Sequence, residues 1–388
     1  MPRIADALER ESRTVDLEQD HFERLLRRRE RKERNRRIRA GAVGVSVALA
    51  MGIIFARSLT SDRIPADRPA EPRPAPAAPG TLAYALDGDI YVADPDGSNA
   101  VKIADGRSAE ECYGWGGEYW AEGSMWSPDG RYLAYRRFTD CGSDENPRDV
   151  VISDAEGNVV ATFPSQGWNI AWSPDSTRVA VWDVVFESIG VYGIEGARQT
   201  QLTIPPGSLA SGDHDPVWMP DGTALMVPNV EVPLDGGTPR QLPLPARAGW
   251  TAYSPNGSHV AYSASRSLTV ARADGFEPRA VFGDWAWKPT WSPTGDRIAF
   301  VTDVGRKGFA ELRVVDVATG SVSLVTEAER GTWLGVSVIG FSPEGDRILF
   351  SKTKSRGAGE GSLWSIGVDG SHARLVVAGT TQGDWLAR

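Results

Sequence analysis

The most regular feature of the chain is a five-residue pattern, an aromatic residue followed by Ser-Pro-Asp-Gly with small variations, and a short apolar segment after it. These apolar segments, such as residues 132–135 and 297–300, have the length of a β-strand. The pattern begins at Trp126, Trp172, Trp218, Tyr253, Trp291 and Phe341, at spacings of 46, 46, 35, 38 and 50 residues. Repeats of this length are typical of propellers and solenoids.

Each repeat carries the signals for four strands. A second apolar segment follows the first and ends at a turn with Asp-Gly or a close relative, as in residues 150–157 and 268–275. A last strand, such as residues 240–242, leads toward the next motif. Four short strands joined in this way predict an antiparallel meander, which is one propeller blade. We expect the aromatic residue to be buried between blades, the proline to end the innermost strand, and the Asp-Gly pair to form the reversal.

The two ends of the repeat region complement each other. Residues 81–84 and 89–93 look like the later strands of a blade that lacks its motif strand, and residues 384–387 look like a motif strand with no blade after it. If the last strand joins the first blade, the ring closes and no sheet edge is left open there. The sequence therefore predicts an all-β fold over residues 81–388, a seven-bladed β-propeller closed by the C-terminal strand.

An α-helix and one transmembrane helix are predicted before the propeller. Residues 40–56 are 17 residues without a charge, at the lower end of the roughly 17–25 that cross a bilayer. A cleaved signal peptide and a buried core helix are the alternatives, but 39 residues precede the apolar run, and ten Lys/Arg lie between Arg24 and Arg39. We predict a transmembrane helix over residues 40–58, with the basic helical segment 1–39 in the cytoplasm and the propeller outside the cytoplasmic membrane.

The segment between the predicted span and the propeller, residues 59–80, is rich in proline, with six prolines from 61 to 80. Proline fixes φ and lacks a backbone donor, so an extended, semi-rigid linker is expected. Residues 1–39 have two interpretations. They form either a solvated helix beside the membrane or a docking helix for a cytoplasmic partner or anionic lipid.

The charge is divided unevenly along the chain. Residues 1–39 contain 13 Lys/Arg and 9 Asp/Glu, a net +4, which leaves 42 acidic and 29 basic residues after them, a net −13. Nucleic-acid binding depends on neutralising phosphates with Lys and Arg, so an acidic main domain argues against a nucleic-acid partner.

The motif, followed by strands like Ile298-Ala299-Phe300 and Ile90-Tyr91-Val92 and the turn Asp94-Pro95-Asp96-Gly97, resembles the TolB-type β-propeller repeat over about residues 80–388. In that family the loops leading into the motif strand and the loops between the second and third strands lie on one face. The whole arrangement also resembles anchored proteins found beside extracytoplasmic-function sigma factors in actinobacteria. Residues 1–57 lack the His-x-x-x-Cys-x-x-Cys signature of the best-known anti-sigma domains, since they contain only His21 and no cysteine.

The resemblance also bears on the two cysteines, Cys112 and Cys141. Both fall in loops that the family's layout places on one face, so a disulfide is expected outside the cytoplasm. With 28 residues between them, it would stabilise the fold by roughly 3 kcal/mol.

The sequence lacks four common catalytic and ligand-binding motifs. There is no G-x-S-x-G elbow, P-loop, H-E-x-x-H or EF-hand loop. Asp213-His214-Asp215 is a local cluster with metal-ligand chemistry, but it needs further ligands from elsewhere, and a solvated loop is the simpler interpretation. We therefore predict neither a metal, nor a cofactor, nor a catalytic site.

Tryptophan is the more informative signal, with 14 in the chain. Seven lie in the loops or strand starts that lead into the motif: Trp115, Trp120, Trp168, Trp250, Trp285, Trp287 and Trp333. Acidic residues lie among them: Glu118, Asp213, Asp215, Asp284 and Asp384. Aromatic anchors near polar groups suit a surface that binds a protein, peptide or glycan. The competing interpretation is that these rings pack between blades.

The resulting expectation is a membrane-anchored, non-enzymatic binding or sensing module that signals inward through residues 1–39 to a sigma factor or another regulator. Two other classes stay open. One is a structural or assembly scaffold of the envelope, and the other is a propeller hydrolase or lyase with its site in the channel mouth.

Overall fold

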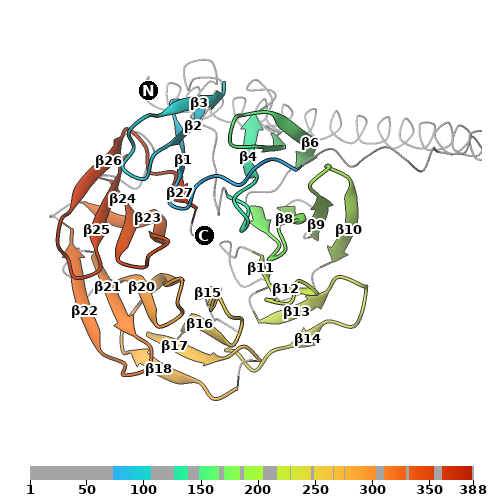
Figure 1. Cartoon of the computed structure of the whole chain (residues 1–388). Coiled ribbons are helices and arrows are strands. Elements are labelled where there is room, and N and C mark those ends of the chain that lie inside the picture. The colour runs from blue at the N-terminus through green and yellow to red at the C-terminus, as the bar shows by residue number, and fades with distance from the viewer. Residues whose placement is uncertain are drawn as a thin grey trace, which may run out of the picture. The chain divides into compact units, whose positions relative to one another are not determined.

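The repeats form seven antiparallel sheets arranged as the blades of a ring (Figure 1). The structure is a computed structural model, and residues 73–388 form one compact unit of it. It describes residues 73–105, 126–138, 148–165, 170–183, 188–203, 216–227, 229–245, 249–264, 266–274, 276–302, 310–328, 332–353 and 361–386. The predicted basic helix and membrane span lie outside these residues. Within them, no helix has the length and apolar character that a membrane crossing requires.

Each blade is numbered along the chain, and its strands are given from the innermost outward. Blade 1 contains β27 (Gly383–Trp385), β1 (Leu82–Leu86), β2 (Asp89–Ala93) and β3 (Val101–Ala104). Blade 2 contains β4 (Leu133–Phe138), β5 (Arg148–Ser153) and β6 (Val159–Ser165), with Trp126 bridged to Leu133 on the inner side. Blade 3 contains β7 (Ile170–Trp172), β8 (Arg178–Asp183), β9 (Ser188–Gly193) and β10 (Arg198–Thr203).

The remaining four blades follow the same order. Blade 4 contains β11 (Val217–Trp218), β12 (Ala224–Val227), β13 (Val230–Pro233) and β14 (Arg240–Gln241). Blade 5 contains β15 (Gly249–Tyr253), β16 (His259–Ala264), β17 (Ser267–Arg272) and β18 (Arg279–Phe282). Blade 6 contains β19 (Trp287–Trp291), β20 (Arg297–Thr302), β21 (Glu311–Asp316) and β22 (Val322–Glu327). Blade 7 contains β23 (Trp333–Phe341), β24 (Arg347–Thr353), β25 (Gly361–Gly367) and β26 (Arg374–Ala378).

The C-terminal strand closes the ring, as the sequence predicts. β27 pairs with β1 in antiparallel register, with Leu82 opposite Trp385 and Tyr84 opposite Gly383. Trp385 is buried in a cluster that joins blades 7 and 1 and also contains Leu349 and Leu363. Burial of a large aromatic ring at this seam stabilises the join between the two ends of the domain.

The serine of the motif stabilises the turn between the first and second strands. In blade 2 the amide of Ser127 donates to the carbonyl of Tyr132 (2.8 Å), and the amide of Tyr132 donates to the Ser127 hydroxyl (3.0 Å). Ser127 is fully buried, so its hydroxyl offers an acceptor where water cannot. The same bond to a serine hydroxyl is made by the amides of Arg178, His259, Arg297 and Arg347.

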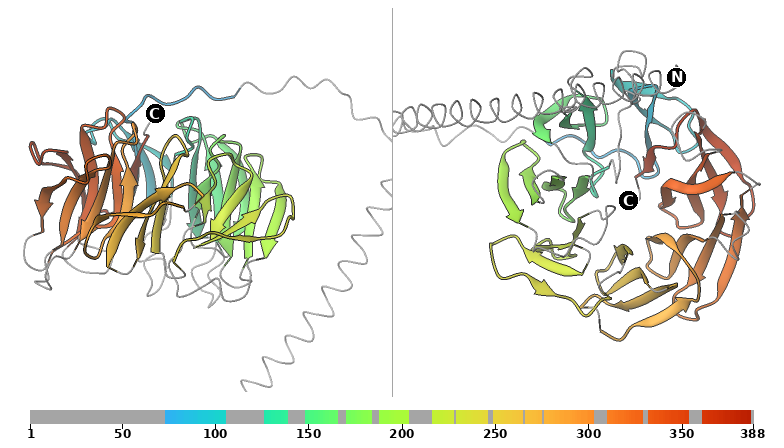
Figure 2. Two further views of the ribbon diagram at one scale, coloured as in Figure 1. Left: turned by 90° about the horizontal axis from the view of Figure 1, so that it is seen from below. Right: turned by 180° about the vertical axis from the view of Figure 1, so that it is seen from behind.

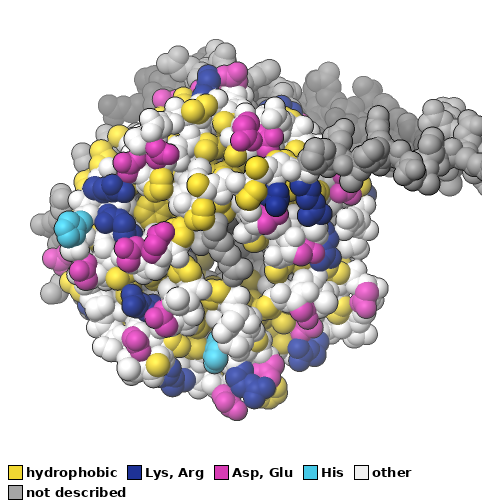
Figure 3. Space-filling model, viewed as in Figure 1, with side chains coloured by type: hydrophobic (Ala, Val, Ile, Leu, Met, Phe, Trp, Pro, Cys, Tyr) yellow, Lys and Arg dark blue, Asp and Glu magenta, His cyan; other side chains and the backbone are white. Residues whose placement is uncertain are grey.

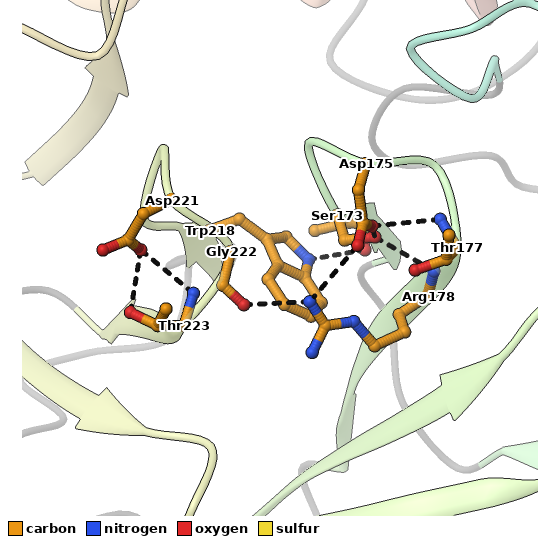
Figure 4. A network of polar contacts seen from close by, with 9 residues as sticks. Ser173, Asp175, Thr177, Arg178, Trp218, Asp221, Gly222 and Thr223 are labelled. Carbon is orange, nitrogen blue, oxygen red and sulfur yellow. Dashed lines mark hydrogen bonds and ion pairs between the residues drawn. The ribbon is translucent and has the colours of Figure 1, made fainter.

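The motif aromatics pack between neighbouring blades and are fixed by hydrogen bonds across the seam. The indole N–H of Trp218 donates to the carbonyl of Ala171 in blade 3 (3.0 Å). Arg178 of blade 3 lies 4.9 Å from the centre of the same ring and donates to the carbonyl of Gly222 (2.9 Å; Figure 4). Trp291 repeats the indole bond, to the carbonyl of Ala252 in blade 5 (3.0 Å).

The seam between blades 4 and 5 departs from the pattern at two positions that touch each other. Met219 replaces the motif serine of blade 4, and Tyr253 replaces the motif tryptophan of blade 5. The Tyr253 hydroxyl lies 3.0 Å from Met219 Sδ and 3.5 Å from Met226 Sδ. Burial raises the pKa of Tyr253 well above its ordinary value.

The strand order gives the ring two different faces. The turns between the first and second strands and between the third and fourth strands lie on one face, which we call the turn face. The connections between the second and third strands and between blades lie on the other, which we call the loop face. Figure 3 views the turn face and shows basic and acidic side chains interspersed over it, without a field of one sign.

The last part of the proline-rich linker binds to the turn face. The amide of Ala77 donates to the carbonyl of Gly130 in blade 2 (2.9 Å), and the amide of Gly80 donates to the carbonyl of Leu386 (2.8 Å). The guanidinium of Arg131 also donates to the carbonyl of Pro74. In side view the described linker and the C-terminal strand reach the same face (Figure 2). Residues 74–80 therefore cover the place where the ring closes.

Candidate functional site

Trp250 and Lys288 form a pair at the loop-face end of the innermost strands of blades 5 and 6. Each residue lies three positions before the motif aromatic of its blade, Tyr253 or Trp291. The innermost strand runs from the loop face to the turn face, so this position is at the mouth of the ring. The Lys288 ammonium lies 5.3 Å from the centre of the Trp250 ring. Both side chains are half-buried, and a cation–π contact contributes about 0.5–1 kcal/mol when it is exposed and about 2 kcal/mol when it is fully desolvated.

Both residues of this pair occupy β-bulges. The register of β15 against β16 shifts between Gly249 and Thr251, and that of β19 against β20 shifts between Trp287 and Thr290. Trp250 and Lys288 sit inside these shifts, where the regular alternation of side chains is broken. A bulge re-aims a side chain, and bulges are common beside binding sites.

The backbone at both positions is strained. Trp250 has φ of 39° and Lys288 has φ of 49°, and they are the only non-glycine residues with positive φ within the named strands of the described chain. For bulky residues this conformation is rare and unfavourable. In a second lysine–tryptophan pair, the Lys352 ammonium lies 5.2 Å from the centre of the Trp364 ring, and neither residue has a positive φ. Strain, and not the cation–π contact itself, distinguishes the pair at the mouth.

The loop between β18 and β19 places a second aromatic ring beside an ion pair. Trp285 is half exposed, with 50% of its surface accessible. Asp284 Oδ1 accepts from the amide of Trp285 (2.8 Å) and lies 3.4 Å from the guanidinium of Arg266. Arg266 occupies the connection between β16 and β17 and also has a positive φ, 63°. The exposed indole therefore projects from a backbone that the Asp284 carboxylate holds in place.

Ser263 connects these two groups of residues. Its hydroxyl donates to the carbonyl of Ala286 in the loop (2.6 Å), and its backbone is paired with Gly249, the neighbour of Trp250. The Trp250–Lys288 pair and the Trp285–Asp284–Arg266 group thus belong to one part of the loop face, which we call the mouth site.

Two residues of the predicted rim, Trp287 and Asp384, make contacts that stabilise the propeller itself. Trp287 packs against the buried cluster of blades 6 and 7, which includes Leu312 and Phe350. Asp384 accepts a hydrogen bond from the amide of Trp126 (3.1 Å), so it joins the closing strand of blade 1 to blade 2. Packing between blades, the competing interpretation of the tryptophans, thus fits Trp287 better than it fits Trp285.

The other predicted rim residues cannot be placed in the mouth site. Trp333 begins β23, and its side chain is not described. The remaining ones lie outside the described residues: Trp115, Glu118, Trp120, Trp168, Asp213 and Asp215. Cys112 and Cys141 also lie there, so the disulfide remains a prediction. In the described ranges no group of three or more His, Cys, Asp and Glu converges on a point.

Two residues of the mouth site, Lys288 and Arg266, are absent from the sequence prediction. Lys288 has a detectable signal, because aligning the repeats on their motif aromatic puts it at the position of Trp250. Arg266 has none, since it is one of many arginines in polar connections.

No protein-family model matches the chain, and no curated protein sequence matches it either. Many solved structures do. One is TolB from Acinetobacter baumannii, with 17% identity and a TM-score of 0.45 over 79% of this chain, which spans 65% of that protein. Another is an oligogalacturonate lyase in complex with manganese, with 15% identity and a TM-score of 0.51 over 78% of this chain and 85% of that one. A functionally unknown protein from Desulfotomaculum acetoxidans has 11% identity and a TM-score of 0.51 over 78% and 96%.

The fold is a seven-bladed β-propeller. At identities this low the matched structures share the fold alone with this chain, and a propeller fold is compatible with many activities.

Proposed function

We propose that the protein is a ligand-binding module whose ligand binds at the mouth site on the loop face. The observation that carries this proposal is the strained pair of Trp250 and Lys288 on equivalent bulges of adjacent blades. Strain at two equivalent positions is an energetic cost to the fold that a binding function would explain. The proposed role is binding without catalysis, and the ligand is a protein, a peptide or a glycan.

The exposed side chains around this pair support the same role. An aromatic ring that is half exposed beside a charged pair gives a ligand both apolar area and hydrogen-bonding partners. Trp285, Asp284 and Arg266 provide this combination within two connections of blade 5. Sites of this kind are common at the mouths of closed β-structures.

The proposed location is the outer side of the cytoplasmic membrane, with residues 40–58 as the anchor. The linker reaches the propeller on the turn face, through Ala77 and Gly80. These contacts leave the loop face free of the described residues of the linker. Signalling through residues 1–39 to a sigma factor or another cytoplasmic regulator is part of this proposal and rests on the sequence alone.

Site-specific photo-crosslinking in intact cells tests the proposed site without knowledge of the ligand. A photoreactive phenylalanine analogue is introduced at position 285 of the full chain, and a matched one at position 276. Phe276 is a suitable control because it is an exposed aromatic of the same blade, 57% accessible, in the turn between β17 and β18 on the opposite face. We expect a discrete adduct at 285 and none at 276. Equal adducts at both positions, or adducts at 276 alone, would contradict the proposed site.

A further inference from the structure

We infer that the ligand of the mouth site is a saccharide that stacks on Trp285. This inference rests on the proposed function and adds the chemical class of the ligand to it. The indole of Trp285 presents a flat, apolar and half-exposed surface. The C–H face of a pyranose ring is a matching surface, because it is apolar and flat and its edge carries hydroxyl groups.

The polar groups beside Trp285 suit hydroxyl pairs. The Asp284 carboxylate accepts hydrogen bonds, and the Arg266 guanidinium, 3.4 Å away, donates them in a fixed planar arrangement. Neighbouring hydroxyls of a sugar can each donate and accept, so they can bond to both partners at once. Arg266 has an accessible side chain, with 62% of its surface exposed, and is therefore open to such a ligand.

The other exposed large hydrophobic residues of the described chain lie away from the mouth site. Peptide recognition relies on pockets or grooves that take aliphatic and aromatic side chains. Among the described residues, the exposed large hydrophobic side chains other than Trp285 lie on outermost strands or in the turn between β17 and β18: Val101, Val159, Val160, Phe276, Leu324 and Leu375. The described loop face thus offers an aromatic platform without an exposed large aliphatic surface.

The Trp250–Lys288 pair provides a second contact point on the same face. It lies at the start of the innermost strands, and Ser263 links it to the loop that carries Trp285. The ammonium of Lys288 is a donor next to an aromatic ring, and at the first contact point the Arg266 guanidinium and the Trp285 amide share the Asp284 carboxylate. A ligand with several sugar units can reach both points, so an oligosaccharide is expected to bind more tightly than its monosaccharide.

Direct binding measurements on the full chain in detergent micelles test this inference. The probes are chito-oligosaccharides, gluco-oligosaccharides and oligogalacturonates, each with its monosaccharide, and a random peptide library of similar mass. The variants are Trp285→Ala, Asp284→Asn and the control Phe276→Ala. Asp284→Asn keeps an oxygen that can accept from the Trp285 amide while removing the charge that faces Arg266. The thermal midpoint of each variant verifies that it is folded.

We expect at least one oligosaccharide to bind. Trp285→Ala should weaken that binding about tenfold or more, Asp284→Asn about threefold, and Phe276→Ala less than about twofold. Binding of library peptides that depends on Trp285, with no saccharide bound, would overturn the inference and leave the proposed mouth site intact. Saccharide binding that is unchanged in Trp285→Ala would overturn the inference as well. Failure of every probe, together with no adduct at position 285, would overturn both.

Discussion

Replacing Gly157 by alanine should destabilise the propeller much more than the same replacement at Gly236. Both glycines lie in turns between the third and fourth strands of a blade, and both have positive φ, 87° and 81°. They differ in their surroundings. A Cβ at Gly157 would come within 2.4 Å of the carbonyl oxygen of Ile103 in blade 1, whereas a Cβ at Gly236 would meet nothing within 4 Å.

The magnitude follows from separating the two costs. The left-handed backbone costs an alanine roughly 1–2 kcal/mol at either position. At Gly157 the new methyl group would also lie closer to a backbone oxygen than the roughly 3.3 Å that such a contact needs. The turn and β3 must then move apart, and overpacking of this kind costs about 1–3 kcal/mol. We expect a loss of about 1–2 kcal/mol for Gly236→Ala and about 2–5 kcal/mol for Gly157→Ala.

The assay is denaturant unfolding of the full chain in detergent, followed by tryptophan fluorescence. The midpoint concentration should fall more for Gly157→Ala than for Gly236→Ala, with similar slopes. Equal losses in the two variants would refute the contact between the blade 2 turn and β3. The turns between third and fourth strands would then not hold neighbouring blades together in the way the structure indicates.

Three further substitutions test the packing of the ring. Trp385→Ala should cost about 3–5 kcal/mol, because it removes a buried aromatic ring from the closing strand; a loss below about 1 kcal/mol would argue against closure by β27. Thr302→Val should raise the free energy of unfolding by about 1 kcal/mol, and the thermal midpoint with it, since the Thr302 hydroxyl is buried and makes no hydrogen bond within the described structure. A destabilised variant would reveal a partner for that hydroxyl. Burial raises the pKa of Tyr253 above its value in the unfolded chain, so the protonated phenol stabilises the fold fully below about pH 10. Above about pH 10 this stabilisation decreases by about 1.4 kcal/mol per pH unit. Stability of Tyr253→Phe should therefore fall less steeply above pH 10, and parallel curves would contradict this.

The architecture could be predicted from the sequence because it depends on repeated local chemistry. Each motif serine accepts from an amide of the following strand, and each motif aromatic has a place between two blades, so six copies determine six seams. The seventh follows from Trp385, the first residue of an incomplete copy that pairs with β1. A single copy would have predicted a turn and nothing more.

The mouth site could be predicted only in part, because it depends on departures from that regularity. The sequence indicates Trp250, Trp285 and Asp284 by residue type, but Trp287 and Asp384 have the same signal and serve packing and closure. A bulge shifts the register by one residue, so alternation along the strand does not tell where Trp250 or Lys288 points. The pairing of Asp284 with Arg266 joins two connections whose approach depends on the folded blade.

Hydrogen exchange tests the central claim, that the ligand binds at the mouth site on the loop face, most directly. Exchange is measured on the full chain in detergent, alone and with the envelope fraction that gives the adduct at position 285. We predict slower exchange for the amides of residues 249–251 and 283–288 and no change for residues 126–133 on the turn face. Slower exchange confined to residues 126–133 or to the outermost strands, with residues 249–251 and 283–288 unaffected, would contradict the account.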